Sequence, residues 1–389
     1  MKFAIMNHLL LYCFLSLLFY SSPDAENLPI RRTVVNQEKD TIISGAEQTD
    51  SYLPYIKGKK IAVFANQTSR VGDKHLIDTL SALGIQIQKI FSPEHGFRGS
   101  AEAGEKVMNG KDPQTGTPII SLYGDHKKPS AMDLAGIDVI IFDIQDVGAR
   151  FYTYISSLEY VMEAALENEK QLIILDRPNP NGWYIDGPVL DKKYKSFVGM
   201  QPVPIVYGMT IGEYAMMIAG EGWLGSEKAN QNYKAEASKK DSKKSIMVIP
   251  CCHYDHSKKY VLQVNPSPNL KEMQSVYLYP STCLFEGTIL SEGRGTDKPF
   301  QVFGHPDMPS SLYSFTPEPN AGAKSSKCFF EKCFGWDLSG SAEDVLKEVD
   351  GKVQIKYLID AYKLFPGKDS FFIKENFFQK TGNDILMED

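Results

Sequence analysis

Short apolar runs alternate with segments of helical periodicity along the first two thirds of this chain. The apolar runs cover residues 60–65, 85–91, 117–122, 138–142, 171–175 and 246–250. Continuous apolar runs of this length are typical of strands that are buried on both faces of a sheet. The segments with apolar residues on one helical face cover residues 75–83, 152–168 and 210–223. This alternation predicts an α/β fold, with a parallel sheet that helices cover on both faces.

Local signals indicate where elements and domains begin and end. Thr210 and Glu213 form the pattern of a capping box, which predicts a helix that begins there. Residues 228–244 are polar and lysine-rich without an apolar period, so we expect a solvated excursion. After about residue 266 the spacing changes and Pro and Gly turns follow one another closely. We therefore expect a first domain over residues 51–265 and a smaller, mixed α/β domain over residues 266–389.

The N-terminal residues have the layout of a secretory signal peptide. Lys2 precedes an apolar run at residues 9–20, which gives way to small and polar residues. This run is too short to span a bilayer, and no later segment approaches ~18 apolar residues, so we expect no stable membrane insertion once residues 1–25 are removed. Cys13 lies inside the run rather than at its end, which makes a lipoprotein the weaker alternative. We expect a secreted or periplasmic protein, with residues 26–50 as a linker or N-terminal arm.

Composition and missing motifs exclude several classes of protein. The net charge of −6 and the lack of a basic stripe argue against nucleic acid as a partner. No G-x-G-x-x-G follows a predicted strand, and no P-loop, G-x-S-x-G or H-E-x-x-H occurs, so the common nucleotide, serine-nucleophile and zinc chemistries lose support. The C-C-H-Y-D-H stretch at residues 251–256 looks metal-like but lacks further ligands, and we expect no metal or organic cofactor. Cys328 and Cys333 allow either a disulfide or buried free thiols.

Polar side chains gather where the predicted strands end. Glu94, His95 and Arg98 follow the run at residues 85–91, within F-S-P-E-H-G-F-R-G. The loops after the runs at residues 138–142 and 171–175 carry Asp143, Asp146, Arg150, Tyr152, Asp176 and Asn179. Because the carboxyl ends of parallel strands share one edge of a sheet, we expect these groups to converge in a functional cleft. A set of purely structural turns is the alternative.

Loops of the second half add hydroxyl, amide and carboxylate groups beside aromatic residues. Asn269, Glu286 and Arg294 lie in these loops, close in sequence to Tyr279 and Phe300. Polar groups beside aromatic faces suit a sugar, which offers many hydroxyls and an apolar ring face. A structural salt bridge of Glu286 and a loop-fixing role of Arg294 are equally compatible with the sequence. The abundant carboxylates favour general acid/base catalysis of the kind used on glycosidic bonds.

A series of motifs occurs in an order known from one family. They are F-S-P-E-H-G-F-R-G, A-G-E, D-P-x-T-G-x-P, S-L-Y-G, F-D-I-Q-D-V-G-A-R-F-Y-T-Y, L-D-R-P-N-P-N-G, G-M-T-I-G-E, P-S-P-N, F-E-G-T and G-R-G-T. Over about residues 51–300 the chain therefore resembles the NamZ-like exo-β-N-acetylmuramidases, a family of peptidoglycan glycosidases. The resemblance implies a Rossmann-like N-terminal domain without a nucleotide, a smaller α/β C-terminal domain and an active cleft between them. It also implies that Glu94 is the catalytic acid.

The resulting hypothesis is an exo-acting glycosidase that releases N-acetylmuramic acid from the non-reducing end of peptidoglycan fragments, such as muropeptides and their disaccharides. Glu94 would protonate the leaving oxygen, and a second carboxylate would activate water or attack the sugar. The resemblance does not identify that second group. On chemistry alone, Asp146 and Glu286 are the first candidates, with Asp143 and Asp176 behind them.

His95 and Arg98 would either position Glu94 or bind the lactyl carboxylate of the sugar. Arg150 and Arg294 are alternative candidates for binding that carboxylate. Tyr152, Asn179 and Asn269 complete the expected substrate-binding set. The rival hypothesis is a non-catalytic muropeptide-binding protein, and a hydrolase of the stem peptide or of an ester is a weaker one. Family members usually continue beyond the region that ends this chain, so we expect a truncated or divergent C-terminus.

Overall fold

The computed structural model describes residues 41–97, 108–238 and 244–387. The predicted signal peptide, most of the predicted linker and Arg98 lie outside these residues. Within the described ranges, no helix has the length and apolar character that crossing a membrane requires.

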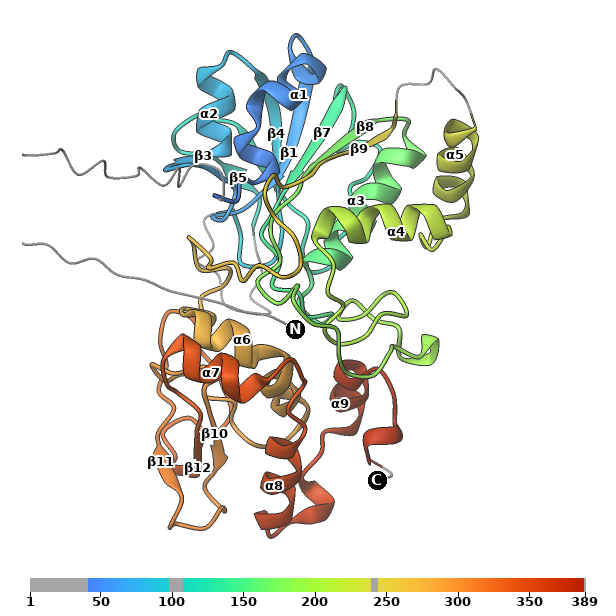
Figure 1. Ribbon diagram of the computed structural model, residues 1–389. Coiled ribbons are helices and arrows are strands. Elements are labelled where there is room, and N and C mark those ends of the chain that lie inside the picture. The colour runs from blue at the N-terminus through green and yellow to red at the C-terminus, as the bar shows by residue number, and fades with distance from the viewer. Residues whose placement is uncertain (1–40, 98–107, 239–243, 388–389) are drawn as a thin grey trace, which may run out of the picture. The chain divides into compact units, whose positions relative to one another are not determined.

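A seven-stranded sheet forms the centre of the first part of the described chain (Figure 1). In spatial order its strands are β5 (Gly110–Lys111), β6 (Pro118–Ser121), β4 (Gln86–Ser92), β1 (Lys60–Ala65), β7 (Val139–Asp143), β8 (Gln171–Leu175) and β9 (Ile246–Ile249). All neighbours pair in parallel except β5, which is antiparallel to β6. The parallel strands follow the order of a Rossmann-type sheet, in which the chain starts at the centre, moves outward and then returns to the other side. The predicted Rossmann-like parallel sheet is confirmed.

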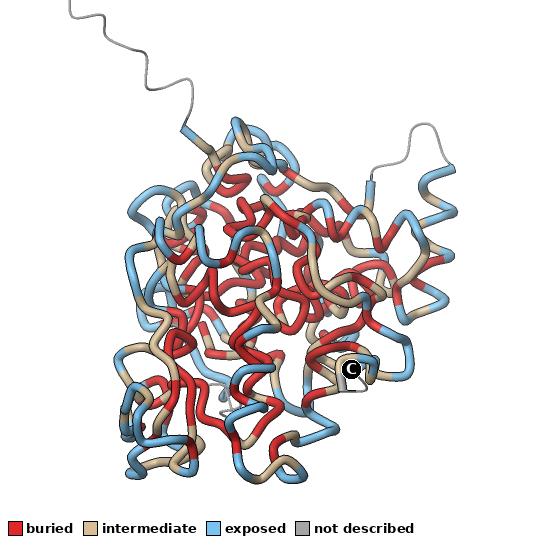
Figure 2. Tube along the Cα trace, turned by 60° about the horizontal axis from the view of Figure 1, so that its bottom comes forward, coloured by how far each residue is buried: buried red, intermediate tan, exposed pale blue. Residues whose placement is uncertain are grey.

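Helices cover both faces of this sheet because the side chains of each strand alternate between them. On one face, Ile61 and Val63 of β1 belong to an apolar cluster with α1 (Thr49–Ile56) and α2 (Leu76–Ala82). On the other face, Phe64 stacks on Phe142 with ring centroids 4.7 Å apart. That cluster includes α3 (Tyr154–Glu167) and α4 (Ile211–Glu221). Figure 2 shows many buried residues, in red, in the interior of the molecule.

The helix α4 begins as the sequence predicts. The Thr210 side chain accepts a hydrogen bond from the backbone N–H of Glu213, and the Glu213 carboxylate accepts one from the backbone N–H of Thr210. Two donors at the helix start are satisfied in this way. The capping box is confirmed.

Two segments differ from the prediction. Most of the expected solvated excursion is helix α5 (Glu227–Ala237), which Ser226 caps and which Asn232 ties to the Leu166 carbonyl oxygen at the end of α3. The buried positions of α5 are Ala229 and Asn230, and so small a face gives no apolar period in the sequence. Residues 41–50, expected to belong to the linker, include the buried positions Ser44, Gly45 and Ala46.

The C-terminal part has a smaller antiparallel sheet with helices, which confirms the predicted mixed α/β region. The sheet consists of β10 (Val302–His305), β12 (Cys333–Asp337) and β11 (Tyr313–Phe315), in that spatial order. The helices are α6 (Met273–Thr282), α7 (Ala342–Val349), α8 (Lys356–Leu364) and α9 (Lys374–Thr381). A 3-10 turn, η4 (Cys283–Gly287), continues from α6.

In the N-terminal part of the chain, β2 (Arg70–Val71) and β3 (Lys74–His75) form a separate antiparallel pair.

The last helix packs closely on the 3-10 turn η4. A Cβ atom at Gly287 would lie 2.6 Å from the Cα atom of Phe377, so no larger residue fits without moving α9. The close approach brings one turn of α9 beside Glu286. The predicted domain boundary between residues 265 and 266 stays a prediction.

Candidate active site

A pocket of about 200 Å³ lies where loops from the carboxyl edge of the large sheet meet residues of the C-terminal part. Its lining residues are Glu94, His95, Tyr123, Phe151, Tyr152, Thr153, Phe197, Val198, Ser267, Asn269, Tyr279, Glu286, Arg294, Phe300 and Lys380. The loops after β4, β6 and β7 each contribute to it, as expected for a Rossmann-type sheet. Six of the residues that the sequence singled out therefore line one pocket.

Glu94 lies two residues beyond β4 and is oriented by hydroxyl groups. The Tyr123 hydroxyl donates to Glu94 Oε1 at 2.8 Å, and the Thr153 hydroxyl donates to Glu94 Oε2 at 3.1 Å. His95 adopts a left-handed backbone conformation with φ of 68°, which is uncommon for a residue other than glycine. Such a conformation next to an ionisable group in a pocket is typical of functional loops.

Glu286 lies in η4 and is held by two cations. Arg294 Nη2 donates to Glu286 Oε1, and Lys380 Nζ pairs with Glu286 Oε2. Burial by itself would raise the pKa of Glu286, but Lys380 and Arg294 outweigh burial and lower the pKa to about 2. Glu286 therefore carries its negative charge throughout the neutral range.

Aromatic side chains wall the pocket. Phe151, Tyr279 and Phe300 pack edge to face in a chain, with centroid distances of 5.4 Å and 4.9 Å. The Tyr152 hydroxyl donates to the Pro266 carbonyl oxygen at 2.9 Å, and Asn269 Nδ2 donates to the Gly322 carbonyl oxygen at 2.7 Å. Tyr152 and Asn269 therefore line the pocket and also hold neighbouring loops in place through these hydrogen bonds. Apolar faces beside hydroxyl and amide groups suit a sugar ring.

Two predicted carboxylates lie at the same edge of the sheet but outside the pocket. Both oxygens of Asp143 accept hydrogen bonds from Arg177, from Nε at 2.6 Å and from Nη2 at 2.9 Å. Asp176 accepts from the Thr210 hydroxyl at 2.7 Å and from the Gly212 N–H at 2.8 Å, at the start of α4. These carboxylates hold the loops together, so the expectation that all strand-end acids reach the cleft needs correction.

Asp146 is also buried away from the lining of the pocket. Its Oδ2 atom accepts from the Tyr207 hydroxyl and from the Gly148 N–H, and its Oδ1 atom has no hydrogen-bond partner within the described residues. Burial raises its pKa to about 7, against the hydrogen bonds from Tyr207 and Gly148. This pKa would suit an acid or base at neutral pH, but the position does not, because Asp146 does not face the pocket.

Arg150 and Asn179 have structural contacts instead of pocket positions. The fully buried Arg150 donates to the carbonyl oxygens of Pro188, Val203, Lys380 and Thr381 at 2.7–2.9 Å. Asn179 donates through Nδ2 to the Met209 carbonyl oxygen, and its Oδ1 atom accepts from the Asn181 N–H. Gly148 has φ of 76°, and a Cβ atom there would lie 2.2 Å from Asn179 Oδ1, so the V-G-A-R motif requires glycine. Neither Arg150 nor Asn179 lines the pocket.

Three pocket residues that contact Glu94 or Glu286 received no role from the sequence. Tyr123 lies in S-L-Y-G and Thr153 in F-Y-T-Y, so ordered motifs mark both positions without assigning them a task. Lys380 gave no signal, because it lies far from Glu286 in the chain and within an ordinary amphipathic segment. Only the packing of α9 on η4 brings its amine into the pocket.

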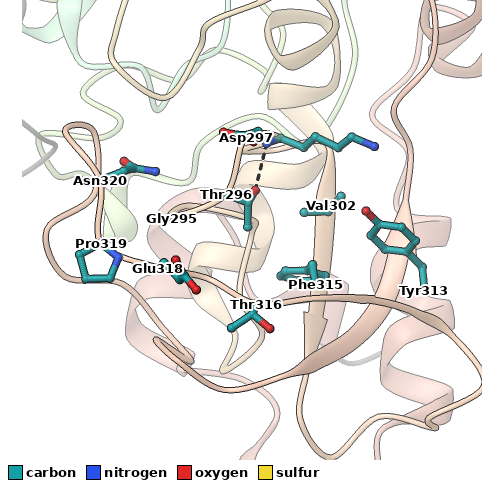
Figure 3. A pocket seen from close by; sticks show the side chains of 11 residues that line it. Gly295, Thr296, Asp297, Val302, Tyr313, Phe315, Thr316, Glu318, Pro319 and Asn320 are labelled. Atoms are coloured by element: carbon teal, nitrogen blue, oxygen red, sulfur yellow. Dashed lines mark hydrogen bonds between the residues drawn. The ribbon is translucent and has the colours of Figure 1, made fainter.

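A larger pocket of about 440 Å³ lies against the small sheet and contains none of the candidate site residues (Figure 3). In Figure 3, Tyr313 and Asn320 lie at opposite ends of it, with Thr296 and Glu318 between them. Lys298, which also lines this pocket, pairs through Nζ with Asp337 at 2.7 Å. Residues 295–298 line the larger pocket, whereas Arg294 of the same loop lines the smaller one. The smaller pocket, which combines two acids with cations and aromatic walls, is the candidate active site.

The metal-like stretch at residues 251–256 has other contacts. His253 Nδ1 lies 3.0 Å from the Thr41 carbonyl oxygen, and His256 contacts the Gly182 carbonyl oxygen and Glu213. Among the described residues, no group of three or more His, Cys, Asp and Glu side chains is arranged to hold a metal ion. Cys328 and Cys333 are free thiols in this structure.

Comparison with known proteins identifies the relatives of this chain. Residues 61–274 match the family model "Exo-beta-N-acetylmuramidase NamZ, N-terminal", and residues 277–389 match the corresponding C-terminal model. The peptidoglycan beta-N-acetylmuramidase NamZ of Bacillus subtilis (strain 168) is 35% identical over 381 residues, which are 93% of this chain and 86% of that protein.

Two crystal structures of DUF1343 family proteins from Bacteroides fragilis NCTC 9343 are similar in fold. One is 46% identical with a TM-score of 0.78 and covers 90% of both chains. The other is 28% identical with a TM-score of 0.70 and covers 90% of this chain and 91% of that chain. The family matches, the relative and these structures agree over nearly the whole described chain, and the chain belongs to the NamZ exo-β-N-acetylmuramidase family of glycosidases.

Proposed function

We propose that this glycosidase is exo-acting and removes N-acetylmuramic acid from the non-reducing end of peptidoglycan fragments. The observation that carries the proposal is that Glu94 and Glu286 line the same pocket, which has aromatic walls. A pocket of about 200 Å³ is the size of about one sugar unit, which suits an enzyme that removes a single terminal sugar. The name of the Bacillus subtilis relative supports the same substrate. We also propose that the protein is exported and acts on fragments outside the cytoplasm.

Glu94 is the general acid in this proposal. The hydroxyl groups of Tyr123 and Thr153 contact its two carboxyl oxygens and fix its orientation at the pocket. A proton that Glu94 delivers to the leaving glycosidic oxygen lets the glycosidic bond break without release of a strongly basic alkoxide. Water then forms the new bond to the anomeric carbon and gives up a proton to the surrounding solvent.

Glu286 is the second carboxylate, and its charge suits a different task. With a pKa of about 2 it is a weak base, so it is poorly suited to remove a proton from water. A permanent negative charge in the pocket stabilises the positive charge that develops on the sugar in an oxocarbenium-like transition state. Two carboxyl groups in electrostatically distinct surroundings are typical of glycosidases that divide the roles of acid and stabiliser.

The test is the substitution Glu94→Gln, which keeps the side-chain volume and removes the acid. We expect turnover of a chromogenic N-acetylmuramide to fall by about 10²–10⁴-fold, the range that general acid catalysis contributes. Binding of N-acetylmuramic acid, measured by calorimetry, should change little. Glu318→Gln is the matched control, because Glu318 lines only the larger pocket, and it should retain activity.

The outcome also separates this proposal from its rival. A wild-type protein that binds the sugar but releases no chromophore would be a muropeptide-binding protein rather than an enzyme. Glu94→Gln with unchanged turnover would exclude Glu94 as the acid.

A further inference from the structure

The candidate site contains more positive than negative charge on its C-terminal side. Lys380 and Arg294 contact Glu286, while Arg294 also approaches Glu292 at 3.5 Å and Lys327 pairs with Glu292 at 2.9 Å. Three cations thus meet two carboxylates, which leaves one positive charge without an internal counter-ion in this cluster. A buried excess charge is costly, and a bound anion would neutralise it.

Only two of these cations face the pocket. Lys327 does not line it, and its amine is occupied by three backbone carbonyl oxygens in addition to Glu292. Lys380 and Arg294 both line the pocket that contains Glu94. The excess charge is therefore accessible to a ligand at the same place as the proposed acid.

The donors of these two side chains are not exhausted. A guanidinium has five N–H donors, and within the described residues Arg294 makes a hydrogen bond through Nη2, to Glu286. An ammonium group has three donors, and Lys380 Nζ has a single anionic contact there, also to Glu286. Both cations are held over aromatic rings: Lys380 Nζ lies 5.5 Å from the Phe151 ring centroid, and Arg294 Cζ lies 5.3 Å from that of Phe300.

The backbone of Lys380 is held in position by Arg150. The buried guanidinium of Arg150 donates to the backbone carbonyl oxygens of Lys380 and Thr381, both at 2.9 Å. This contact restrains the last turn of α9, so the Lys380 amine stays at the pocket without a ligand. Glu286 keeps both cations in place in the same state.

We propose that Arg294 and Lys380 form the subsite that binds the lactyl carboxylate of the muramic acid residue. This inference rests on the proposed function, since the lactyl group with its carboxylate is what distinguishes N-acetylmuramic acid from N-acetylglucosamine. Of the cations that the sequence suggested for this role, Arg150 is committed to backbone carbonyl groups and Arg98 lies outside the described residues. His95 and Arg294 remain in the pocket, and of the two Arg294 carries a charge that does not depend on pH near neutrality. It is joined by Lys380, which the sequence did not reveal. Glu286 is then the counter-ion that holds both cations in place before the ligand binds.

The test compares two substrates that differ in one charge. A chromogenic N-acetylmuramide with a free lactyl carboxylate is assayed beside the same compound with a lactyl amide. We expect the wild type to prefer the carboxylate in kcat/KM, and Lys380→Met and Arg294→Gln each to reduce this preference about 10- to 100-fold, mainly through KM. Lys298→Met is the matched control, because Lys298 belongs to the same loop as Arg294 but pairs with Asp337, and it should leave the preference unchanged.

A binding measurement keeps the result separate from catalysis. In the Glu94→Gln background, calorimetry measures the affinity for N-acetylmuramic acid and for its lactyl amide. The difference between the two affinities reports recognition of the carboxylate without turnover. Tighter binding of the acid, lost in Lys380→Met and Arg294→Gln, supports the subsite even if no variant hydrolyses either substrate. Folded variants that keep the full preference for the carboxylate, with circular dichroism melting like the wild type, would overturn it.

Discussion

Single carboxyl groups in this protein differ because of what surrounds each of them. Glu94 receives two hydroxyl donors, Glu286 is paired with two cations, and Asp146 has one oxygen buried without a hydrogen-bond partner among the described residues. A cation next to a carboxylate lowers its pKa, whereas burial without a cation raises it. The same residue type can therefore act as an acid, as a fixed charge or as a structural group.

Asp146 makes the stability of the fold depend on pH. Its pKa is raised to about 7, so between its unfolded value near 4 and pH 7 the folded state binds more protons than the unfolded state. Stability therefore falls as pH rises through this window. Asp146→Asn removes this dependence. We compare the free energy of unfolding of the variant with that of the wild type at each pH. We expect this difference, variant minus wild type, to be larger at pH 8 than at pH 5 by about 2–3 kcal/mol, at ~1.4 kcal/mol per pKa unit.

Urea denaturation at both pH values measures this difference. Burial also raises the pKa values of Asp176 and Glu159. Both residues are present in wild type and variant, so their contributions to the pH dependence of stability cancel in the comparison. Asp73→Asn, at an exposed position, is the control and should follow the wild type. Equal pH slopes for wild type and Asp146→Asn would show that Asp146 is ionised in the folded protein.

At the scale of elements, the candidate site depends on contacts between loops and the last helix. The loop after β7 carries Arg150, which reaches the carbonyl groups at the end of α9, while η4 carries Glu286, which reaches Lys380 of the same helix. Gly382 follows α9 with φ of 80°, and a Cβ atom there would lie 2.6 Å from Arg150 Nη2. The end of α9 is thus shaped to receive this guanidinium.

Removal of the guanidinium should loosen α9. In Arg150→Met four carbonyl oxygens lose a charged donor, and we expect a loss of at least about 3 kcal/mol in the free energy of unfolding. Amide hydrogen exchange over residues 374–381 should become faster, and KM for a muramide should rise because Lys380 is no longer fixed.

The exposed Lys352→Met is the control for a lost positive charge and should change stability by less than about 0.5 kcal/mol. Unchanged exchange in α9 of Arg150→Met, with lower stability elsewhere, would mean that Arg150 acts only on the loops at Pro188 and Val203.

At the scale of the whole molecule, the strand order explains why one edge of the sheet carries the site. In a Rossmann-type sheet the crossovers on either side of the first strand run in opposite directions, which opens a crevice at the carboxyl ends of the strands. The loops after β4, β6 and β7 lie at this crevice and supply Glu94, Tyr123 and Thr153. Other proteins with this fold often bind a dinucleotide in this crevice. In this protein the crevice contains an acid and hydroxyl groups.

Export is the prediction that concerns the whole chain. We expect the protein to be found outside the cytoplasm with residues 1–25 removed, because a basic residue and a short apolar run precede small, polar residues. Intact-mass measurement on the periplasmic or extracellular fraction identifies the mature N-terminus. Leu17→Arg interrupts the apolar run and should keep the precursor in the cytoplasm. A wild-type chain that stays in the cytoplasm with residues 1–25 attached would contradict the proposal.

Patterns that depend on neighbours in sequence were predictable. The strands β1 and β8, the capping box of α4 and the Rossmann-like sheet follow from apolar periodicity and short-range hydrogen bonding. The Glu94 loop could be predicted because a strand of the buried sheet ends directly before it. Helix α5 could not, since its buried face is limited to positions such as Ala229 and Asn230, which carry little apolar signal.

The amino-acid sequence by itself determined the sheet, the edge at which polar groups gather and the family to which the chain belongs. Only the tertiary structure decided which of these groups face the pocket. Asp143 and Glu94 both follow strands of one sheet, yet Arg177 occupies both oxygens of Asp143 while Glu94 reaches the pocket. Lys380 joins Glu286 only through the packing of α9 on η4. The physical reason is that periodicity is a local property, whereas a charge acquires its partner and its solvation from residues that are distant in the chain.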